Sequence, residues 1–280
     1  MREYSKGLQI EQMFYYTPEM PPAMRPLSDI VESLQAKGLR RGVGPMPGQP
    51  SVPAIPTGQP PLDAALRTGG WPRGCMALLD APLGAGATSL ALGSLSACQA
   101  AGGLVAWLDL EGSFDPSTAA RCGVNLEWLL LARPRDPGEA VELSAWLART
   151  RLLDVLVLDL GRAPVASRAL TRLPELLTRF GGVVLALASS ASARAALGDV
   201  AGIRVALERR AWLAVGRDLV GERVHATVAR HRWALAGASA QLDLWFSEGR
   251  RIDPLLPSLA APKAALATLE DRPALQILSA

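Results

Sequence analysis

Short apolar runs alternate with amphipathic segments through the middle of the chain. Several runs are continuously apolar and have the length of strands that are buried on both faces. These runs cover residues 75–79, 104–110, 126–132, 152–160 and 182–190. Three intervening segments, 88–102, 137–150 and 167–181, have helical composition, and Pro174 is expected to kink the last one or to start its second half. The alternation predicts an α/β fold with a mostly parallel sheet and helices on both faces.

The pattern changes towards the carboxyl end of the chain. Residues 203–216, 224–237 and 240–250 have the composition of strands that turns connect in succession. They predict an antiparallel C-terminal extension of the sheet. From residue 254 onward the chain is interrupted by proline, and this tail is expected either to dock as a helix or to stay loose.

Three regions follow from these patterns. Residues 1–50 are predicted to hold an N-terminal arm, a helix over residues 27–39 that Ser28 caps, and a linker rich in glycine and proline. Residues 51–253 form the predicted core. Residues 254–280 form the C-terminal tail.

Composition excludes some classes of protein. Hydrophobic residues make up 49% and charged residues 20%, and the net charge of +3 permits nucleic-acid contact without demonstrating it. Cys75, Cys98 and Cys122 are widely spaced, which argues against structural zinc and fits a reducing compartment. The sequence has no signal-peptide pattern and no apolar run of membrane-spanning length, so we expect a cytoplasmic protein. The seven tryptophans are expected mostly in the core, with some as anchors for a partner.

The segment APLGAGATS, which joins the first apolar run to the first predicted helix, is the most informative in the chain. A phosphate-binding loop at such a place has the pattern G-x-x-x-x-G-K-[ST]. Gly84, Gly86, Thr88 and Ser89 fit a loop that wraps phosphate, whereas Ala87 stands at the lysine position. Turns from strand to helix often hold two glycines, so this segment alone does not establish a phosphate-binding loop.

The missing lysine has a chemical consequence. The lysines of this chain are Lys6, Lys37 and Lys263, and none is near the loop in sequence. One electrostatic donor at a transition state is typically worth about 10²–10³ in rate. Hydrolysis is therefore not expected and no cofactor is required, although weak binding of ATP and magnesium through the backbone and Thr88 stays open.

Ordered blocks give the wider context. They are I-P-T-G, then L-D-A-A-L, then G-G-W-P-R-G before the loop, followed by AWLDLEGSFDP, LLDVLVLDL and the closing strands. In this order, over residues 55–253, the chain resembles bacterial RecA. The resemblance implies a RecA-like P-loop NTPase fold.

The resemblance also suggests roles for individual residues. Glu111 falls on the catalytic glutamate, here a vestigial base, and Asp159 falls on the acid that with Thr88 would hold magnesium if a magnesium nucleotide binds. Arg230 and Arg232 fall where RecA has a lysine pair that reaches nucleotide across a subunit interface. Taken singly, each of these residues has a structural interpretation without function, because acids at strand ends and charges on the outward faces of strands are common.

Departures from RecA narrow the expectation. The connections GRAPVAS and SASARAALGDVAG, where RecA carries its DNA-binding loops, are short. The pattern is similar to the ImuA group of short RecA-like accessory proteins in SOS mutagenesis and translesion synthesis. RecA, a translesion polymerase subunit, single-stranded DNA and self-association are the expected partners. From charge and chain position, a residual DNA surface is predicted at Arg194, Arg204, Arg209 and Arg210.

Two other functions stay open. The first is an active ATP-dependent DNA-binding ATPase or recombinase, with Glu111 as base and with Thr88 and Asp159 around magnesium. The second is a regulatory RecA-fold module unrelated to DNA.

Overall fold

The computed structural model describes residues 53–166, 170–215, 217–246 and 275–279. The arm, helix and linker predicted in residues 1–50 therefore lie outside the described residues, as does most of the predicted tail. In the described part, none of the helices combines the length and apolarity that crossing a bilayer demands.

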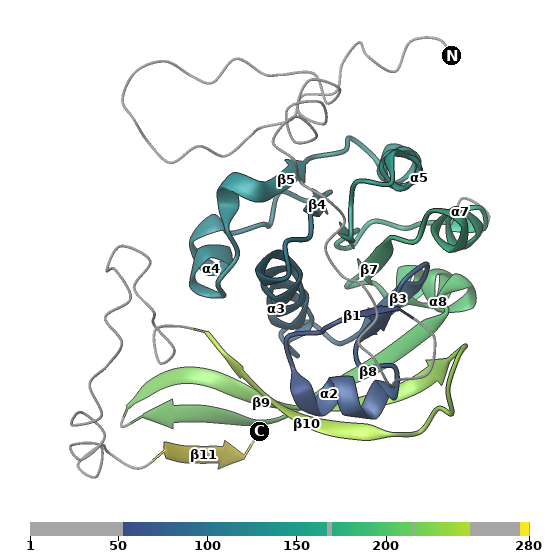
Figure 1. Cartoon of the computed structure of the whole chain (residues 1–280). Coiled ribbons are helices and arrows are strands. Elements are labelled where there is room, and N and C mark those ends of the chain that lie inside the picture. The colour runs from purple at the N-terminus through teal and green to yellow at the C-terminus, as the bar shows by residue number, and fades with distance from the viewer. Residues whose placement is uncertain (1–52, 167–169, 216, 247–274, 280) are drawn as a thin grey trace, which may run out of the picture.

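A nine-stranded sheet forms the centre of the molecule (Figure 1). Its order is β10-β9-β8-β3-β7-β6-β4-β5, and β11 pairs with β8. Pairings among the middle strands and between β3 and β8 are parallel. The middle strands are β3 (Met76–Asp80), β4 (Val105–Asp109), β5 (Leu129–Ala132), β6 (Val155–Asp159) and β7 (Val183–Leu187). The predicted mostly parallel sheet is confirmed.

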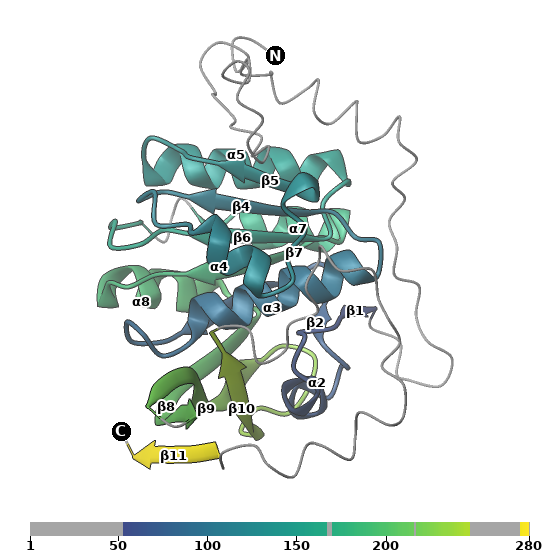
Figure 2. The same ribbon diagram turned by 90° about the vertical axis from the view of Figure 1, so that its left-hand side faces the viewer.

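Helices cover both faces of this sheet. In Figure 2, α3 (Ala87–Ala100) and α4 (Pro116–Arg121) lie in front of the strands. The opposite face carries α5 (Pro137–Thr150), α7 (Leu173–Phe180) and α8 (Ala191–Val200). Two apolar clusters result, one on each side, because every second residue of a buried strand points to the same face.

Some helix boundaries follow from local chemistry. Pro174 lies in the first turn of α7, so it starts the second half of the predicted segment. Ser190 caps α8 by accepting the N–H of Ala193 at 3.2 Å, and residues 191–200, expected as a connection, are helical instead. The run at 126–132 begins with the short 3₁₀ helix η1 (Leu126–Trp128) before β5.

The antiparallel extension is built from long strands. It comprises β8 (Ile203–Val215), β9 (Asp218–His231) and β10 (Ser239–Trp245). β8 is parallel to β3 at its start and antiparallel to β9 along its length. The β8–β9 register shifts at three places, one of which is a bulge between Arg209 and Ala211. β11 (Leu275–Ser279) pairs antiparallel with the far end of β8, where the sequence suggested a helix or a loose tail.

A small subassembly precedes β3. It comprises β1 (Ala54–Ile55), α2 (Pro60–Leu66) and β2 (Trp71–Pro72), which the apolar pattern did not reveal. The Trp71 indole N–H donates to Ser94 Oγ in α3 at 3.0 Å, and Ser94 Oγ donates to Thr57 O at 2.9 Å. These bonds attach the subassembly to α3.

The tryptophans differ in how deeply they are buried. Trp71 and Trp107 are fully buried, whereas the other five are only partly buried. Trp233 and Trp146 pack against the two core clusters, so four of the seven indoles lie in the core or against it, with the edges of the large rings partly at the surface. The five partly buried tryptophans are Trp128, Trp146, Trp212, Trp233 and Trp245.

A buried ion pair joins distant parts of the sheet. Arg73 Nη2 lies 2.6 Å from Asp154 Oδ1, and the side chain of Asp154 is 1% exposed. The other carboxylate oxygen accepts the N–H of Leu104 at 3.0 Å. The pair thus connects the segment before β3 to the starts of β4 and β6.

We expect Asp154→Ala to lower the free energy of unfolding by about 3–5 kcal/mol, because it leaves the Arg73 charge buried without its partner. Asp243→Ala, which breaks the partly exposed pair with Arg223, should cost less than about 1 kcal/mol. Urea denaturation of both variants measures the difference. Equal losses would show that the buried pair is no more important than the exposed one.

Candidate phosphate-loop site

The predicted phosphate loop lies between strand and helix. Residues 81–86 connect the carboxyl end of β3 to α3, which begins at Ala87. Gly84 and Gly86 both have positive φ, +75° and +84°. A Cβ on Gly86 would lie 2.5 Å from Leu244 Cδ1, so both its backbone angle and its neighbours require glycine here.

The loop presents backbone donors at the start of α3. The first hydrogen bond of the helix runs from Leu90 N to Gly86 O at 2.9 Å, so the N–H groups of Ala87, Thr88 and Ser89 come before the helical ladder. Gly86 provides no side-chain cap, and the first turn contains no acid. This end of the helix carries partial positive charge and favours an anion or another acceptor.

The side chains of this turn differ in what they offer. Thr88 is exposed and Ser89 half-buried, so both are near the surface of the turn. Ala87 contributes a methyl group that packs partly against the core. The predicted binding residues Gly84, Gly86, Ala87, Thr88 and Ser89 therefore lie together on one loop and helix start, without a cation among them.

Arginines from elsewhere hold the loop by its carbonyl oxygens. Arg194 of α8 donates to Ala81 O at 2.8 Å, and Arg209 of β8 donates to Gly84 O at 2.8 Å. Arg204 donates through Nε to Asp80 Oδ2 at 2.8 Å, and Arg194 Nε lies 3.7 Å from Asp80 Oδ1. Three of the four predicted DNA-contacting arginines are thus gathered around the phosphate loop.

The fourth predicted DNA contact has a different environment. Arg210 forms an exposed ion pair with Glu208 at 2.8 Å, next to the bulge of β8. Arg209, one residue earlier, places its guanidinium 4.1 Å from the centre of the Trp212 ring. All four arginines have partners within the chain, and their contact with DNA stays a prediction.

A buried acid beneath the loop was missed from the sequence. Glu222 of β9 is 2% exposed, and its Oε1 would lie 3.1 Å from a Cβ on Gly86. Burial raises the pKa of Glu222, and Arg209 opposes that shift across 4.0 Å. The alternation of the sequence could have predicted this burial. Glu222 is in phase with three residues that are buried on the same face of β9, namely Val224, Ala226 and Val228.

Three acids lie near the carboxyl ends of β4 and β6. Asp109 and Asp159 are direct neighbours in the sheet register. Asp109 is fully buried and accepts the N–H groups of Ser113 and Phe114, each at 2.9 Å. Glu111 is exposed, and its carboxylate accepts the N–H of Arg162. The predicted base position and the predicted magnesium-side acid are therefore at the same edge of the sheet.

The carboxyl group of Asp159 has a raised pKa. Burial raises its pKa to about 6, while a hydrogen bond from Gly161 N at 3.1 Å lowers it and the charges of Asp109 and Glu111 raise it. The described residues contain no cluster of three or more His, Cys, Asp or Glu that would hold a metal unaided. The Thr88 hydroxyl and the Asp159 carboxylate are oxygen ligands of the kind magnesium takes alongside phosphate oxygens. These donors fit the metal, but Ala87 adds no charge for the phosphates.

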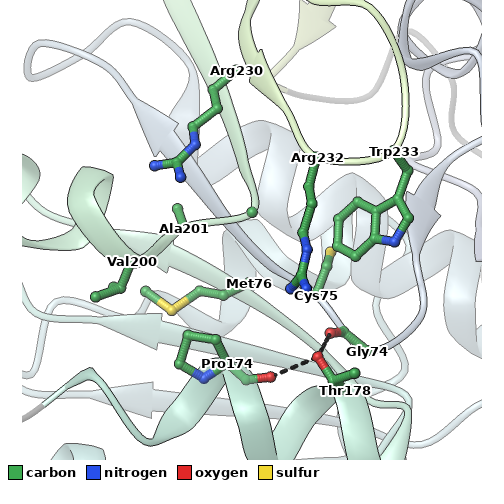
Figure 3. A pocket seen from close by; sticks show the side chains of 11 residues that line it. Gly74, Cys75, Met76, Pro174, Thr178, Val200, Ala201, Arg230, Arg232 and Trp233 are labelled. Carbon is green, nitrogen blue, oxygen red and sulfur yellow. Dashed lines mark hydrogen bonds between the residues drawn. The ribbon is translucent and has the colours of Figure 1, made fainter.

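The predicted interface arginines lie at the other end of the sheet. Arg230 and Arg232, at the end of β9 and just beyond it, border a pocket at the start of β3 (Figure 3). The phosphate loop follows the opposite end of β3. The two arginines are therefore separated from their own loop by the length of that strand.

We expect Asp159→Asn to raise the free energy of unfolding at pH 7.5 by about 1–3 kcal/mol, because each unit of pKa shift corresponds to about 1.4 kcal/mol. In the folded state Asp159 stays protonated up to about pH 6, whereas in the unfolded state it loses its proton near its ordinary pKa of 3.8. Between these two pH values, Asp159 therefore lowers the free energy of unfolding as the pH rises. At pH 4 the gain should shrink towards zero.

Urea denaturation at both pH values tests this, with Asp199→Asn on the exposed side of α8 as the control. No gain at pH 7.5, or the same gain at pH 4, would contradict the assigned pKa.

Comparison with known proteins agrees with this geometry. The family model "RecA N-terminal domain" matches residues 31–171. "Protein RecA" of Chloroflexus aggregans is 29% identical over 266 residues, covering 83% of this chain and 76% of the relative. "Protein RecA" of Frankia casuarinae is 30% identical over 234 residues, covering 72% and 68%. The crystal structure of the RadB recombinase matches with a TM-score of 0.52 and 22% identity, covering 68% of this chain and 95% of that one, which supports the fold alone. This chain belongs to the RecA family.

Proposed function

We propose that this protein is a non-hydrolysing RecA-like accessory protein of DNA repair. Within that class we place it beside the ImuA group, in the SOS response and damage-induced mutagenesis by translesion synthesis. The observation that carries the proposal is Ala87 at the first position of α3, where the turn offers backbone N–H groups but no ammonium group. Such a loop is suited to weak recognition of phosphate rather than to catalysis.

The surroundings of the loop support this proposal. The described residues contain no lysine, and the nearest arginines are engaged with carbonyl oxygens of the loop or with Asp80. In a trans peptide the C=O and N–H groups point in opposite directions, so a guanidinium that braces a loop carbonyl is turned away from that peptide's N–H. Glu222 adds a buried carboxyl group next to Gly86 and contributes no positive charge to the loop.

Partners are proposed from family membership. The relatives are named Protein RecA and RadB recombinase, and proteins of this family generally self-associate and bind DNA. For this chain we propose contact with RecA or a translesion polymerase subunit, with single-stranded DNA and self-association as further contacts. ATP and magnesium are not required for such a role.

One observation favours a second function, an ATP-dependent DNA-binding ATPase. By resemblance to RecA, Glu111, Thr88 and Asp159 fall on positions that hydrolysis would use. Asp159 lies beside Asp109, which precedes Glu111 by two residues, at the carboxyl ends of β6 and β4. In such an enzyme an arginine would have to replace the lysine at the terminal phosphates, with a different geometry. The missing ammonium group leads us to prefer the accessory role.

We expect the purified protein to show only background ATP hydrolysis with magnesium and single-stranded DNA. Ala87→Lys should tighten ATP–magnesium binding at least about tenfold, because it restores a cation at the phosphates. Calorimetry measures the binding and phosphate release measures the turnover. Ala100→Lys adds the same charge at the exposed end of the same helix and should leave affinity unchanged.

Robust turnover that Glu111→Gln abolishes would refute the accessory role and establish the ATPase. Tight nucleotide binding by the unaltered protein would show that the loop does not need its lysine.

Replacing Arg194, Arg204, Arg209 and Arg210 together by alanine should weaken binding of single-stranded DNA. Each lost phosphate contact should reduce the salt-dependence slope by about 0.7, so four contacts would remove nearly 3. Fluorescence anisotropy at several salt concentrations measures both quantities. The control removes four exposed arginines from other elements, namely Arg67, Arg121, Arg149 and Arg172.

Equal losses in the two quadruple variants would mean that only net charge matters. Unchanged affinity in the first variant, with an unchanged melting temperature, would rule out this DNA surface.

A further inference from the structure

A pocket of about 240 Å³ opens at the amino end of β3, away from the phosphate loop (Figure 3). Met76 at the start of β3 and Ala201 at the end of α8 form part of its apolar floor. Thr178 of α7 lines one side, and its hydroxyl donates to Pro174 O at 2.9 Å. Arg232 and Trp233, which follow β9, complete the wall.

The walls of the pocket are fixed by backbone hydrogen bonds. Gly202 N donates to Met76 O at 2.9 Å, and Arg232 N donates to Gly202 O at 3.0 Å. Trp233 N donates to His231 Nδ1 at 3.1 Å, and a Cβ on Gly202 would lie 3.2 Å from the Trp233 ring. A pocket held in shape in this way loses little conformational entropy when it is filled.

The charge of the pocket has one sign. Its lining contains Arg230 and Arg232 but no acid. Arg230 Nη1 donates to Gly198 O at 2.9 Å and so is held at the end of α8. The Arg232 guanidinium lies 5.6 Å from the centre of the Trp233 ring, and among the residues described here no carboxylate pairs with it. One guanidinium is thus available to a carboxylate that enters beside an apolar floor.

Size decides between classes of ligand. Pockets for small molecules and cofactors are typically about 300–1,000 Å³, so this one is small for a nucleotide. It suits a single apolar side chain together with a neighbouring carboxylate, which is how buried anchors are held at protein interfaces. An aspartate or glutamate matches one free guanidinium in a forked geometry.

We propose that this pocket docks a short segment of a partner protein in which an acidic residue stands next to an aliphatic or aromatic anchor. The acid pairs with Arg232, and the anchor enters between Met76, Ala201 and Trp233. The assignment rests on the proposed accessory role, since it names the chemistry of the partner that such a protein recruits. A nucleotide phosphate brought by another molecule is the competing occupant.

The test is a peptide array probed with the full-length protein. Pentapeptides Gly-X-Z-Gly-Gly, with all residues at X and Z, should show enrichment where one position is acidic and the other is apolar. The best peptide is then measured in solution by fluorescence anisotropy. Arg232→Ala should weaken its binding at least tenfold and Arg230→Ala less, whereas Arg149→Ala, at an exposed position of α5, should have no effect.

Three results would overturn the proposal: no peptide binds above background, enrichment does not depend on the acid, or Arg232→Ala behaves like Arg149→Ala with the fold intact by thermal melting. Displacement of the peptide by millimolar ADP or inorganic phosphate through Arg232 would instead assign the pocket to a phosphate group. ATP turnover, measured separately, distinguishes the failures. Lost peptide recognition without turnover refutes the pocket alone, and turnover with peptide recognition intact refutes the accessory role alone.

Discussion

The reversal of the chain from the carboxyl end of β3 into the amino end of α3 is the constraint on which the site depends. This turn brings unpaired backbone N–H groups to the edge of the sheet, and their partial charges favour an acceptor. Gly86 is confined there by its positive φ and by Leu244, so the antiparallel extension helps to set the shape of the loop. The geometry of this loop is therefore a property of the fold and does not depend on a lysine at position 87.

The charged side chains next to the loop are engaged with its backbone or with each other. Arg194 and Arg209 reach the loop but donate to its carbonyl oxygens, and Glu222 places a carboxyl group behind Gly86. The arginines stabilise the backbone of the loop, and Glu222, whose pKa is raised by burial, lies 4.0 Å from Arg209 and adds no positive charge for a phosphate. The loop therefore has the turn and the helix start of a phosphate loop without a cation among its own residues.

The sequence was sufficient for the elements whose burial is simple. The runs at residues 75–79, 152–160 and 182–190 are mostly apolar because helices cover both faces of the strands that they predict, and α5 begins and ends as its pattern predicts. By contrast, α8 was taken for a connection because its segment was matched to the place where RecA carries a DNA-binding loop, although it is about as amphipathic as α5. β1 and β2 have two residues each, too few for any periodicity.

The candidate site was predictable only in part, for a related reason. Gly84 to Ser89 are contiguous, so a linear pattern reveals them. Arg194, Arg209 and Glu222 reach the loop from residues more than 100 positions away, through the order of strands in the sheet.

The pocket at the opposite end is more distant still from any linear pattern, since α7, β3, α8 and the residues after β9 each contribute to it. Its arginines were singled out by resemblance alone, and only the assembled sheet shows that they lie beside an apolar floor and away from their own loop. The two ends of β3 therefore differ in the polar groups that they present. One end offers backbone N–H groups without a cation among the residues of the loop, and at the other end none of the described carboxylates pairs with Arg232, which borders an apolar floor.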